Sequence, residues 1–435
     1  MKARLIDQSS LKDSGIKWAL KISSQYSVEP LFTVLNENNI KNDLTTDYNV
    51  LSLSYGKLVV KDKESNKGLL SANNDSYQII RPGNIILRLT DLQNDKRSLR
   101  VGYANDLGII TSAYVGLTPK NNTVNTKFFY YLLHSYDLLK VFYGYGGGIR
   151  QGMTYKDLKK LPLILPSDNI QKKIVSYLDS KLAIVDKFVS NKYECIEKLK
   201  QSKQAIINNA LTKGLDVDAP TKASCIDWLG DIPNDWVIYP LKRLAKINEF
   251  SLGEKTDPDT EIIYVDISGV DSEGCIINKE SFNFIDAPSR ARRIVRHGDT
   301  IISTVRTYLR AIGYISEPES NLIVSTGFAV CIPNTKIIDQ EFLQYAIRSN
   351  YFIENVVASS YGVSYPAITA ESLGCHKIAI PKKISEQKAI IAHIKSEFRV
   401  IDKAIKKAEY QINFIKEYRS SLVTHAVTGQ LEIKE

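Results

Sequence analysis

Cysteine and histidine are scarce in this sequence, and neither is grouped for chemistry. The five cysteines are odd in number, include no Cys-x-x-Cys pair, and are scattered at Cys195, Cys225, Cys275, Cys331 and Cys375. This pattern argues against a disulfide framework and against a cysteine-based zinc site. The five histidines form no His-Glu-x-x-His cluster or similar group, so we expect the chain to bind no metal.

Long apolar runs are also lacking. No stretch approaches the ~18–20 residues that a helix needs to cross a bilayer. The opening segment MKARLIDQSSLKDSG has no apolar block of the kind found in secretory signals. We therefore expect a cytoplasmic protein without a membrane segment.

Motifs of the common enzyme classes are missing as well. The glycines at 144–148 (GYGGG) are not followed by the Lys-Ser/Thr of a phosphate-binding loop. No Gly-x-Ser-x-Gly elbow occurs, and neither does the Asn/Asp-Pro-Pro-aromatic or Pro-Cys site of a DNA methyltransferase. The Pro258-Asp259 pair is not followed, within its domain, by the acidic-x-Lys of a nuclease. We therefore expect that this chain is not itself an enzyme.

What the chain does have is length and a basic charge. Its 435 residues exceed one ordinary hydrophobic core, which favours two or more domains. Apolar content of 43% and charged content of 24% are typical of globular protein. The 57 Lys and Arg against 48 Asp and Glu give a net charge of +9, which is compatible with a polyanionic partner without proving one.

The chain also repeats itself in order along its length. The offset between matching stretches drifts slightly from one match to the next, and such drift is what loop insertions produce. We infer a tandem duplication with its boundary near Ala219. The matches are IKW (16–18) with IDW (226–228), RPGNIIL (81–87) with RHGDTII (296–302), and ITSAYVGLTP (110–119) with VSTGFAVCIP (324–333).

Each half predicts an α+β globular domain followed by a long helix. Short strands such as NIILRL (84–89) and TIISTV (300–305) follow an Arg-x-Gly turn. Helical periodicity then marks TKFFYYLLHSYDLL (126–139) and DQEFLQYAIRSNYF (339–352). Finally, stretches without Gly or Pro predict long helices from Ser167 to Lys213 and from Lys382 to Thr428, ended by Gly214 and Gly429.

Both long helices carry a heptad pattern. Apolar residues recur at alternating steps of four and three for about five heptads, which is typical of a coiled coil. Lys203 and Arg419 occupy the same core position in the two copies. The pattern consists of Ile390, Ile394, Phe398, Ile401, Ile405, Ala408, Ile412, Ile415, Leu422 and Ala426, and of Ile174, Leu178, Leu182, Val185, Val189, Lys192, Ile196, Leu199, Ile206 and Ala210.

We interpret the fold as two homologous α+β domains joined by two long antiparallel coiled-coil helices, with a pseudo-two-fold internal repeat. A helix of about 37 residues spans ~55 Å, so the pair would hold the domains at a fixed distance. The alternative, in which each helix packs on its own domain, stays open. The predicted segments are domain 1 (1–166), the first helix and linker (167–218), domain 2 (219–381), and the second helix and tail (382–435).

Arginine, amide and tyrosine side chains gather in the loops that follow the matched strands and at the loop-to-helix junctions. Arg suits bidentate contacts with guanine and Gln or Asn with adenine, while further basic residues neutralise phosphate. Ordinary solvated loops, and turns that fix each helix to its domain, remain alternatives. The candidate DNA-binding residues are Arg88, Gln93, Asn94, Arg97, Arg100, Arg150, Arg290, Arg292, Arg293, Arg306, Tyr308, Arg310 and Tyr365.

At this point the sequence resembles the specificity subunit of type I restriction-modification systems, over essentially its whole length. The resemblance is carried by IDWLGDIPNDWVIYPLKRL (226–244), GVSYPAITAESLGCHKIAIPKKISEQKAII (362–391) and SLVTHAVTGQLEI (421–433). The first half answers with GIRQGMTYKDLKKLPLILPSDNIQKKIV (148–175) and AIINNALTKGLDV (205–217).

This resemblance implies two target recognition domains, each of which reads one half of an interrupted double-stranded DNA site, while the paired helices set the gap. It implies two methyltransferase subunits as partners, which bring S-adenosylmethionine and methylate adenine N6. It further implies two restriction subunits, with ATP and Mg, in the complete nuclease. This chain would bind none of these cofactors itself.

The first half departs from the family pattern in two places. Its opening, GIKWALKISSQYSVEPL, lacks the Gly-x-Ile-Pro step, and its helix entry SDNIQ leaves Glu386 of the second half without a counterpart. If these segments dock the methyltransferase, the two halves would dock it with different strength. Two other interpretations stay open: a stand-alone DNA-binding regulatory or antirestriction homologue, and a coiled-coil adaptor that binds only protein.

Overall fold

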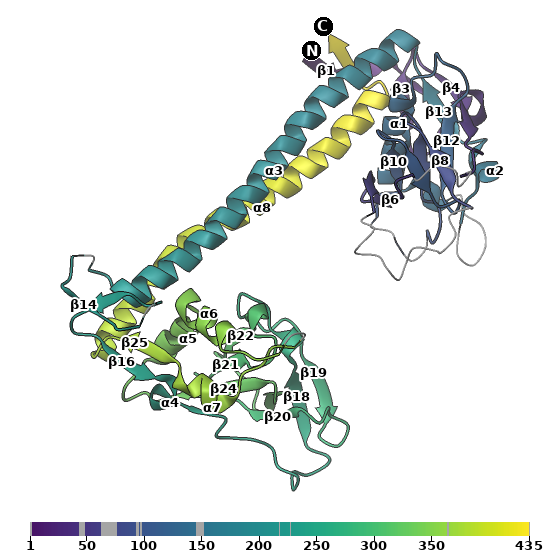
Figure 1. Ribbon diagram of the computed structural model, residues 1–435. Coiled ribbons are helices and arrows are strands. Elements are labelled where there is room, and N and C mark those ends of the chain that lie inside the picture. The colour runs from purple at the N-terminus through teal and green to yellow at the C-terminus, as the bar shows by residue number, and fades with distance from the viewer. Residues whose placement is uncertain are drawn as a thin grey trace. The chain divides into compact units, whose positions relative to one another are not determined.

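The computed structural model describes residues 2–42, 48–61, 76–92, 95, 98–144, 152–216, 218–226, 228–362 and 365–434 (Figure 1). The chain forms two compact units. Unit 1 comprises Met1–Lys192 and Glu409–Glu435, and unit 2 comprises Tyr193–Ala408. Each unit therefore contains one globular domain and part of both long helices.

The core of unit 1 is an antiparallel four-stranded sheet covered by a helix. Its strands are β5 (Leu35–Glu37), β9 (Ile85–Leu87), β10 (Val101–Tyr103) and β12 (Val115–Pro119), in the order β10-β9-β12-β5. The Arg-x-Gly turn before β9 places Gly83 at φ +91°, a conformation that favours glycine. Helix α1 (Thr126–Leu138) buries Phe128, Phe129 and Leu132 in the same core.

Unit 2 repeats this scaffold. Strands β17 (Ala245–Ile247), β21 (Thr300–Ser303), β22 (Ile312–Tyr314) and β24 (Phe328–Pro333) form a sheet in the matching order β22-β21-β24-β17. The register matches as well, because Gly102 lies opposite Ile86 in one sheet and Gly313 lies opposite Ile301 in the other. The predicted duplication is therefore present in the fold.

The second sheets of the two units follow one strand order and differ in how continuously the strands pair. Unit 1 has the hairpin β6 (Leu51–Ser54) and β7 (Lys57–Val60) and the pair β8 (Gln78–Ile80) and β11 (Gly108–Ile110). Unit 2 has one four-stranded sheet, β19 (Glu280–Asn283), β18 (Glu261–Val265), β23 (Leu322–Ser325) and β20 (Ala291–Ile294), in that order. In unit 1 a parallel bridge between Val50 and Ile109 stands where β18 pairs in parallel with β23 in unit 2, so the scaffold is shared in both layers and the units differ in their side chains and loops.

Shorter elements complete both units. The helical stretch predicted at 339–352 is broken into α5 (Gln340–Arg348) and α6 (Asn350–Ala358), because Ser349 adopts extended backbone at ψ 145°. The others are β1 (Lys2–Leu5), β2 (Leu11–Asp13), β3 (Lys21–Ser23), β4 (Ser27–Pro30), β13 (Pro162–Leu165), β14 (Thr221–Ala223), β15 (Asp231–Pro233), β16 (Val237–Pro240), β25 (Lys377–Ile380), β26 (Leu431–Lys434), α2 (Tyr155–Leu158), α4 (Leu241–Leu244) and α7 (Ala370–Cys375), and the 3₁₀ helices η1 (Gln8–Ser10), η2 (Leu31–Thr33), η3 (Val141–Gly144), η4 (Ile267–Gly269) and η5 (Thr307–Leu309).

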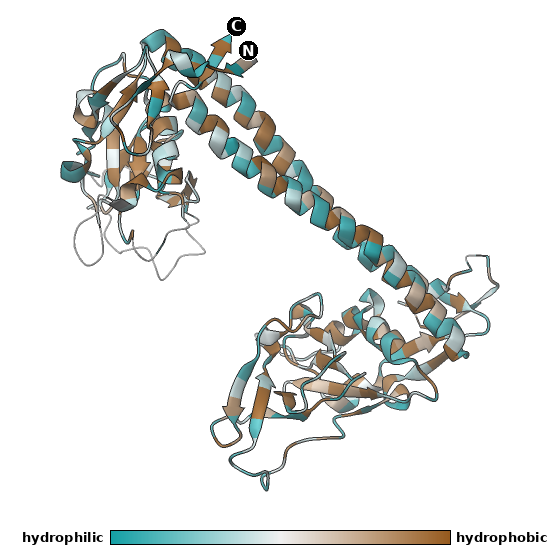
Figure 2. Cartoon of the chain, turned by 180° about the vertical axis from the view of Figure 1, so that it is seen from behind, coloured by the Kyte–Doolittle hydropathy of each residue, from teal (hydrophilic) through white to brown (hydrophobic). Residues whose placement is uncertain are grey.

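The long helices α3 (Asp168–Lys213) and α8 (Ile384–Val427) pack together (Figure 1). Every position of the predicted heptad pattern is buried or half-buried in both helices, which confirms the coiled-coil prediction. Figure 2 shows apolar residues recurring along both helices between hydrophilic ones. The seam continues into each domain core, since Leu178 and Leu182 join the core of unit 1 and Ile390 and Ile394 join that of unit 2.

Two ion pairs fix the antiparallel register of α3 and α8. In unit 1 the Nη1 of Arg419 lies 3.2 Å from Oδ1 of Asp186, and in unit 2 the Nζ of Lys203 lies 2.6 Å from Oδ1 of Asp402. The two acidic partners occupy matching positions of the repeat, as the two basic residues do. Each basic residue that interrupts the apolar seam therefore finds a carboxylate on the facing helix, and the two pairs are copies of one contact.

The start of each long helix is tied to the strand before it by a buried glutamine. The Nε2 of Gln171 donates to the carbonyl of Pro166 at 2.9 Å, and the Nε2 of Gln387 donates to the carbonyl of Pro381 at 2.8 Å. Gln387 makes two further bonds, in which its Oε1 accepts from the backbone N–H of Asp339 and its Nε2 donates to the carbonyl of Ile337.

This difference predicts unequal effects of the same substitution. Gln387→Ala should destabilise the start of α8 by about 2–4 kcal/mol, because it leaves several buried backbone groups without partners. Gln171→Ala, which removes one bond from α3, should cost about 1–2 kcal/mol. Hydrogen exchange of the first turns of α3 and α8 measures both effects in the intact chain. Equal loss of protection in the two variants would contradict this account.

The departure at Glu386 also has a structural explanation. The indole Nε1 of buried Trp236 donates to Oε1 of Glu386 at 2.9 Å. In unit 1 the matching positions hold Tyr26 and Ile170, which line one shared cavity. The two residues change together, so Glu386 satisfies an indole that the first half does not have.

Each long helix ends at a glycine in the left-handed region, as predicted. Gly214 has φ +74° and Gly429 has φ +70°. After Gly429 the chain forms β26, which pairs with β1 so that Ala3 lies opposite Ile433. The end of the chain thereby completes the same domain as its beginning.

Candidate nucleic-acid interface

Four of the predicted DNA-binding residues lie outside the described residues. They are Gln93, Asn94, Arg97 and Arg150. The other nine can be sorted by what each side chain already contacts. A guanidinium that is fully hydrogen-bonded inside the protein has no donors left for DNA, whereas an unpaired one at a surface cavity does.

Arg100 belongs to the first class, and its prediction as a DNA contact is corrected here. Its side chain is fully buried. The guanidinium donates to Tyr143 Oη at 3.0 Å and to the carbonyls of Arg88 at 3.1 Å and Thr90 at 2.9 Å, and also reaches the carbonyls of Asp91 and Asp95. Arg100 therefore holds together the loop after β9 from the inside, and it does not face a ligand.

Arg88 is the remaining described candidate of unit 1. It follows β9 directly, its side chain is half-buried, and its backbone N–H donates to the carbonyl of Arg100 at 2.9 Å. The matching bond in unit 2 joins Ser303 to Ala311, also at 2.9 Å. The two loops therefore share this backbone hydrogen bond, while only the first half has an arginine, Arg88, at this position.

In unit 2 the corresponding loop is held in a strained backbone conformation. Arg306 and Arg310, on either side of η5, have φ +51° and φ +55°. Non-glycine residues rarely occupy this left-handed region, and they cluster at functional sites when they do. The loop is fixed by the backbone N–H of Arg306, which donates to the carbonyl of Pro366 at 2.8 Å, and by a 2.9 Å bond between the hydroxyls of Thr307 and Ser360.

The structure brings three of the predicted residues together at one cavity. The guanidinium of Arg306 lies over the ring of Tyr365, 4.3 Å from its centroid, and Tyr365 is itself 62% exposed. These two residues and Arg290 line a cavity of about 570 Å³ together with Asp266 and Ser268. Among the described residues, the side chains of Arg306 and Arg290 make no hydrogen bond or ion pair, so their donors are available.

The cavity continues past Asp266. Asp266, Ser268 and Arg290 also line an adjoining cavity of about 320 Å³, with Asn278 and Glu280 on its other side. The hydroxyl of Tyr264 donates to Oδ1 of Asp266 at 3.0 Å. Burial raises the pKa of Tyr264, which keeps this hydroxyl protonated as a donor.

The sequence analysis missed Asp266 and Ser268. The sequence does contain a signal for both residues, because Asp266 directly follows strand β18, which ends at Val265, and Ser268 comes two positions later. Polar side chains at such a position are well placed to line a site. The prediction was restricted to basic, amide and tyrosine side chains, and it therefore found the donors of the cavity without the acceptor.

The other predicted residues of unit 2 are less available. Arg310 bonds Asn350 Oδ1 at 2.8 Å and lies 3.7 Å from Glu354. Arg292 donates to its neighbour's carbonyl and lies over the ring of Phe284 at 4.6 Å. Burial lowers the pKa of Arg293. Tyr308 is 50% exposed within η5, between Arg306 and Arg310, and remains a candidate contact.

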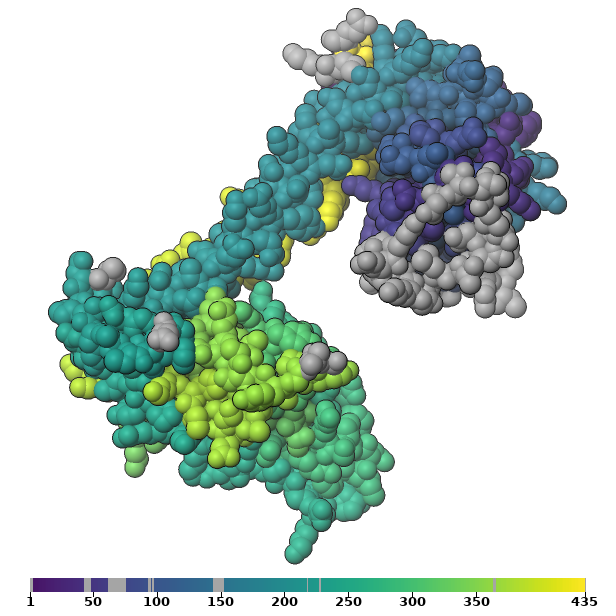
Figure 3. Space-filling model, viewed as in Figure 1, coloured from purple at the N-terminus to yellow at the C-terminus, as the bar shows by residue number. Residues whose placement is uncertain are grey.

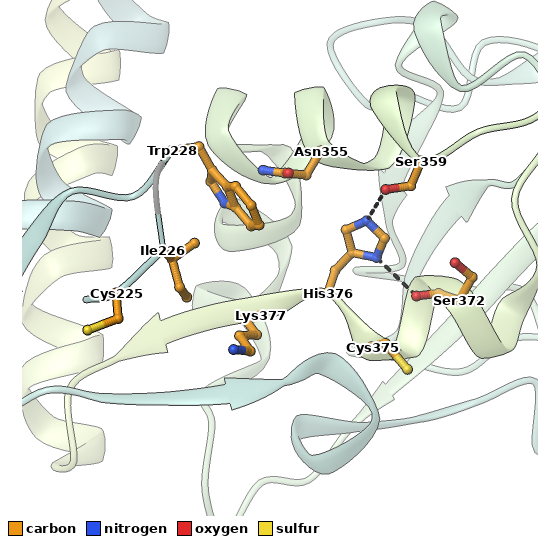
Figure 4. Close-up of a pocket in the computed structure, with 9 residues that line it drawn as sticks. All are labelled: Cys225, Ile226, Trp228, Asn355, Ser359, Ser372, Cys375, His376 and Lys377. Carbon is orange, nitrogen blue, oxygen red and sulfur yellow. Dashed lines mark hydrogen bonds between the residues drawn. The ribbon is translucent and has the colours of Figure 1, made fainter.

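A second cavity of unit 2 is lined by a histidine that is already hydrogen-bonded within the domain. It has a volume of about 430 Å³ and lies between the segment containing Trp228 and helices α6 and α7 (Figure 4). The two helices form part of the exposed surface of unit 2 in Figure 3. Both ring nitrogens of His376 are occupied, Nδ1 at 3.0 Å from the carbonyl of Ser372 and Nε2 at 3.3 Å from the hydroxyl of Ser359. The described residues that line this cavity include no carboxylate, so the histidine has no acid–base partner among them.

The described residues hold neither a candidate metal site nor a candidate membrane-spanning helix. No group of three or more His, Cys, Asp or Glu side chains within them could hold a metal ion. No helix in the same part of the chain combines the length and apolar character that spanning a membrane requires.

Comparison with known proteins gives one consistent result. The family described as "Type I restriction modification DNA specificity domain" matches residues 31–198 and 233–412, once in each half. The specificity subunit of the type I restriction enzyme MjaVIII of Methanocaldococcus jannaschii is 24% identical over 336 residues, which cover 75% of both chains. That of the Escherichia coli enzyme EcoBI is 26% identical over 340 residues, covering 76% of this chain and 70% of its own.

A solved structure shares the fold. The solved chain comes from work on complex assembly and conformational transition of the type I R-M system. It superimposes on the present chain with a TM-score of 0.65 at 15% sequence identity. The match covers 94% of this chain and 99% of that one. The duplicated domains, the paired long helices and the family match in both halves agree, and the chain therefore belongs to the specificity subunits of type I restriction-modification systems.

Proposed function

We propose that each domain of this chain reads one half of a bipartite double-stranded DNA site, and that the α3–α8 pair sets the gap between the halves. The observation that carries this proposal is that two copies of one scaffold carry different loop side chains, since Arg88 and Arg100 of unit 1 stand where unit 2 has Ser303 and Ala311. Two copies of one scaffold with different surfaces suit two different half-site sequences. As a specificity subunit, the chain is the non-catalytic part of the restriction-modification complex.

The electrostatics of unit 2 support a DNA ligand. Arg290 and Arg306 place two guanidinium groups, unpaired among the described residues, at one surface cavity next to exposed Tyr365. Guanidinium groups bind phosphate oxygens and guanine edges, and aromatic rings contribute apolar contacts. A protein-only adaptor would have no need for two guanidinium groups with available donors at one surface cavity.

Methylation and cleavage would come from partner subunits. In the proposed complex two methyltransferase subunits supply S-adenosylmethionine and methylate adenine, and restriction subunits supply ATP- and Mg-dependent nuclease activity. The helix pair offers apolar surface for such partners, since Ile184 and Val400, at matching positions, are 61% and 65% exposed. We propose that these two matching positions contribute to the docking of the partner subunits.

Methylome sequencing of a host that expresses this chain with its methyltransferase tests the proposal. We expect one bipartite, adenine-methylated motif with a fixed gap, and its loss when this chain is omitted. A continuous motif, or the same motif without this chain, would contradict the proposal. DNA binding without any methylation would favour a stand-alone regulatory homologue instead.

A further inference from the structure

We propose that unit 2 reads a G·C base pair, with Arg306 as the donor to guanine and Asp266 as the acceptor from cytosine. This inference rests on the proposed function and makes it specific. It concerns one cavity, lined by Arg306, Asp266, Ser268, Arg290 and Tyr365.

Arg306 is prepared to read a base edge. Its guanidinium is positioned over the Tyr365 ring at 4.3 Å, and its backbone is fixed by the bond to Pro366 and by the left-handed conformation at φ +51°. Stacking on an aromatic face limits the rotamers of a long side chain without using its N–H donors. Because the fork is held in place with its donors available, it can donate two parallel bonds to the O6 and N7 acceptors of guanine.

Asp266 supplies the opposite polarity in the same cavity. It follows β18 directly, its side chain is exposed, and its Oδ1 accepts from the hydroxyl of Tyr264 at 3.0 Å. This bond orients the carboxylate and leaves it further acceptor capacity, because a carboxylate has about four lone-pair sites. No ion pair joins Asp266 to Arg306 or Arg290 among the described residues, so the acceptor is not consumed by the neighbouring donors.

The combination of donor and acceptor selects one kind of base pair. In the major groove a G·C pair presents two acceptors on guanine and the N4 amino donor on cytosine. A fixed guanidinium beside a fixed carboxylate matches that order. An A·T pair presents a single purine acceptor, a central amino donor, a further acceptor and a methyl group. The second N–H donor of the guanidinium fork would therefore face the amino donor and be left unpaired.

Substitution of Arg306, read out on the methylated motif, tests the inference in the assembled complex. With Arg306→Ala we expect one G·C position of a single half-site to become degenerate, with discrimination at that position reduced about 10- to 100-fold. Arg306→Lys retains the charge without the planar fork, so it should keep methylation while discriminating poorly at the same position. Asp266→Asn adds a donor beside the acceptor and should relax the same position.

Two matched substitutions serve as controls. Arg296→Ala removes an exposed arginine of unit 2 that lies over Phe250 at 3.7 Å and outside the cavity. Arg88→Ala changes the loop of unit 1 at the position that matches Ser303. Neither should alter the position that Arg306 controls, and a change there in the Arg296→Ala variant would show general weakening of binding instead of lost recognition.

The outcomes separate this inference from the proposed function. An unchanged motif in Arg306→Ala, or degeneracy at an A·T position, would overturn the G·C inference while the bipartite motif stands. Absence of any bipartite motif with the unaltered chain would overturn the proposed function itself. If Arg306→Ala abolishes methylation altogether, the Arg306→Lys complex is tested instead, by competition binding to DNA sites that carry each of the four base pairs at each position. If the unaltered and the Arg306→Lys complexes discriminate equally between base pairs, the G·C inference is wrong.

Discussion

Arg100→Ala is expected to destabilise the globular domain of unit 1 by more than about 3 kcal/mol, because it leaves buried carbonyl groups without donors. The Arg100 guanidinium links Tyr143 to the carbonyls of Arg88, Thr90, Asp91 and Asp95, and the side chain is fully buried. Hydrogen exchange of β9, β10 and α1 in the full chain measures the loss directly.

Unit 2 provides the internal reference for that experiment. Ala311 already occupies the position that matches Arg100, so exchange in β21 and β22 should be unaffected by Arg100→Ala. Arg88→Ala is the second control, because it removes a half-buried arginine whose side chain makes no hydrogen bond or ion pair among the described residues. Wild-type protection of β9 and β10 in the Arg100→Ala variant would show that the buried guanidinium is dispensable.

Insertion of one heptad into both long helices is expected to widen the gap of the methylated site while both half-site sequences stay the same. Seven helical residues add ~10 Å, which corresponds to about three base pairs at 3.4 Å each. The insertion points midway between the two ion pairs are after Glu194 in α3 and after Tyr410 in α8. Placed there, both heptads preserve the apolar seam and both ion pairs.

A single insertion is the informative control. A heptad inserted in α3 alone changes the spacing of Asp186 and Lys203, while Asp402 and Arg419 on α8 keep theirs. The two ion pairs, Arg419–Asp186 and Lys203–Asp402, can then no longer form at the same time. Loss of activity in that variant, together with a new gap in the double insertion, supports the spacer role. Methylome sequencing gives both readouts, and altered half-site sequences in the double insertion would show that the helices do more than set distance.

Much of the architecture was predictable because it follows from local and repeated patterns in the sequence. The heptad positions such as Ile174 and Ile390 are buried as expected, since a heptad period identifies one face of a helix without knowledge of its partner. The internal repeat likewise places Lys203 and Arg419 at one position. The carboxylates that neutralise them were not predicted, because register between two helices depends on the folded pair.

The candidate site was only partly predictable, and Arg100 and Arg306 show why. Both lie beside matched strands, and both belong to loops rich in arginine. Arg100 is enclosed because Tyr143, 43 residues later, packs against it. Arg306 is exposed to a cavity because Tyr365 provides a flat surface and because Asp266 comes from a different sheet. Sequence order alone does not distinguish these two environments.

The sequence by itself determined that this chain is a duplicated pair of α+β domains with two long pairing helices, because periodicity and self-similarity are properties of residue order. The tertiary structure alone decided which arginines are structural and which have donors to spare. Burial and hydrogen bonding depend on side chains that are distant in sequence and adjacent in space, and the free energy of a charged group is set by that surrounding. The same residue type in the same loop therefore stabilises one domain and keeps its hydrogen-bond donors available at a surface cavity in the other.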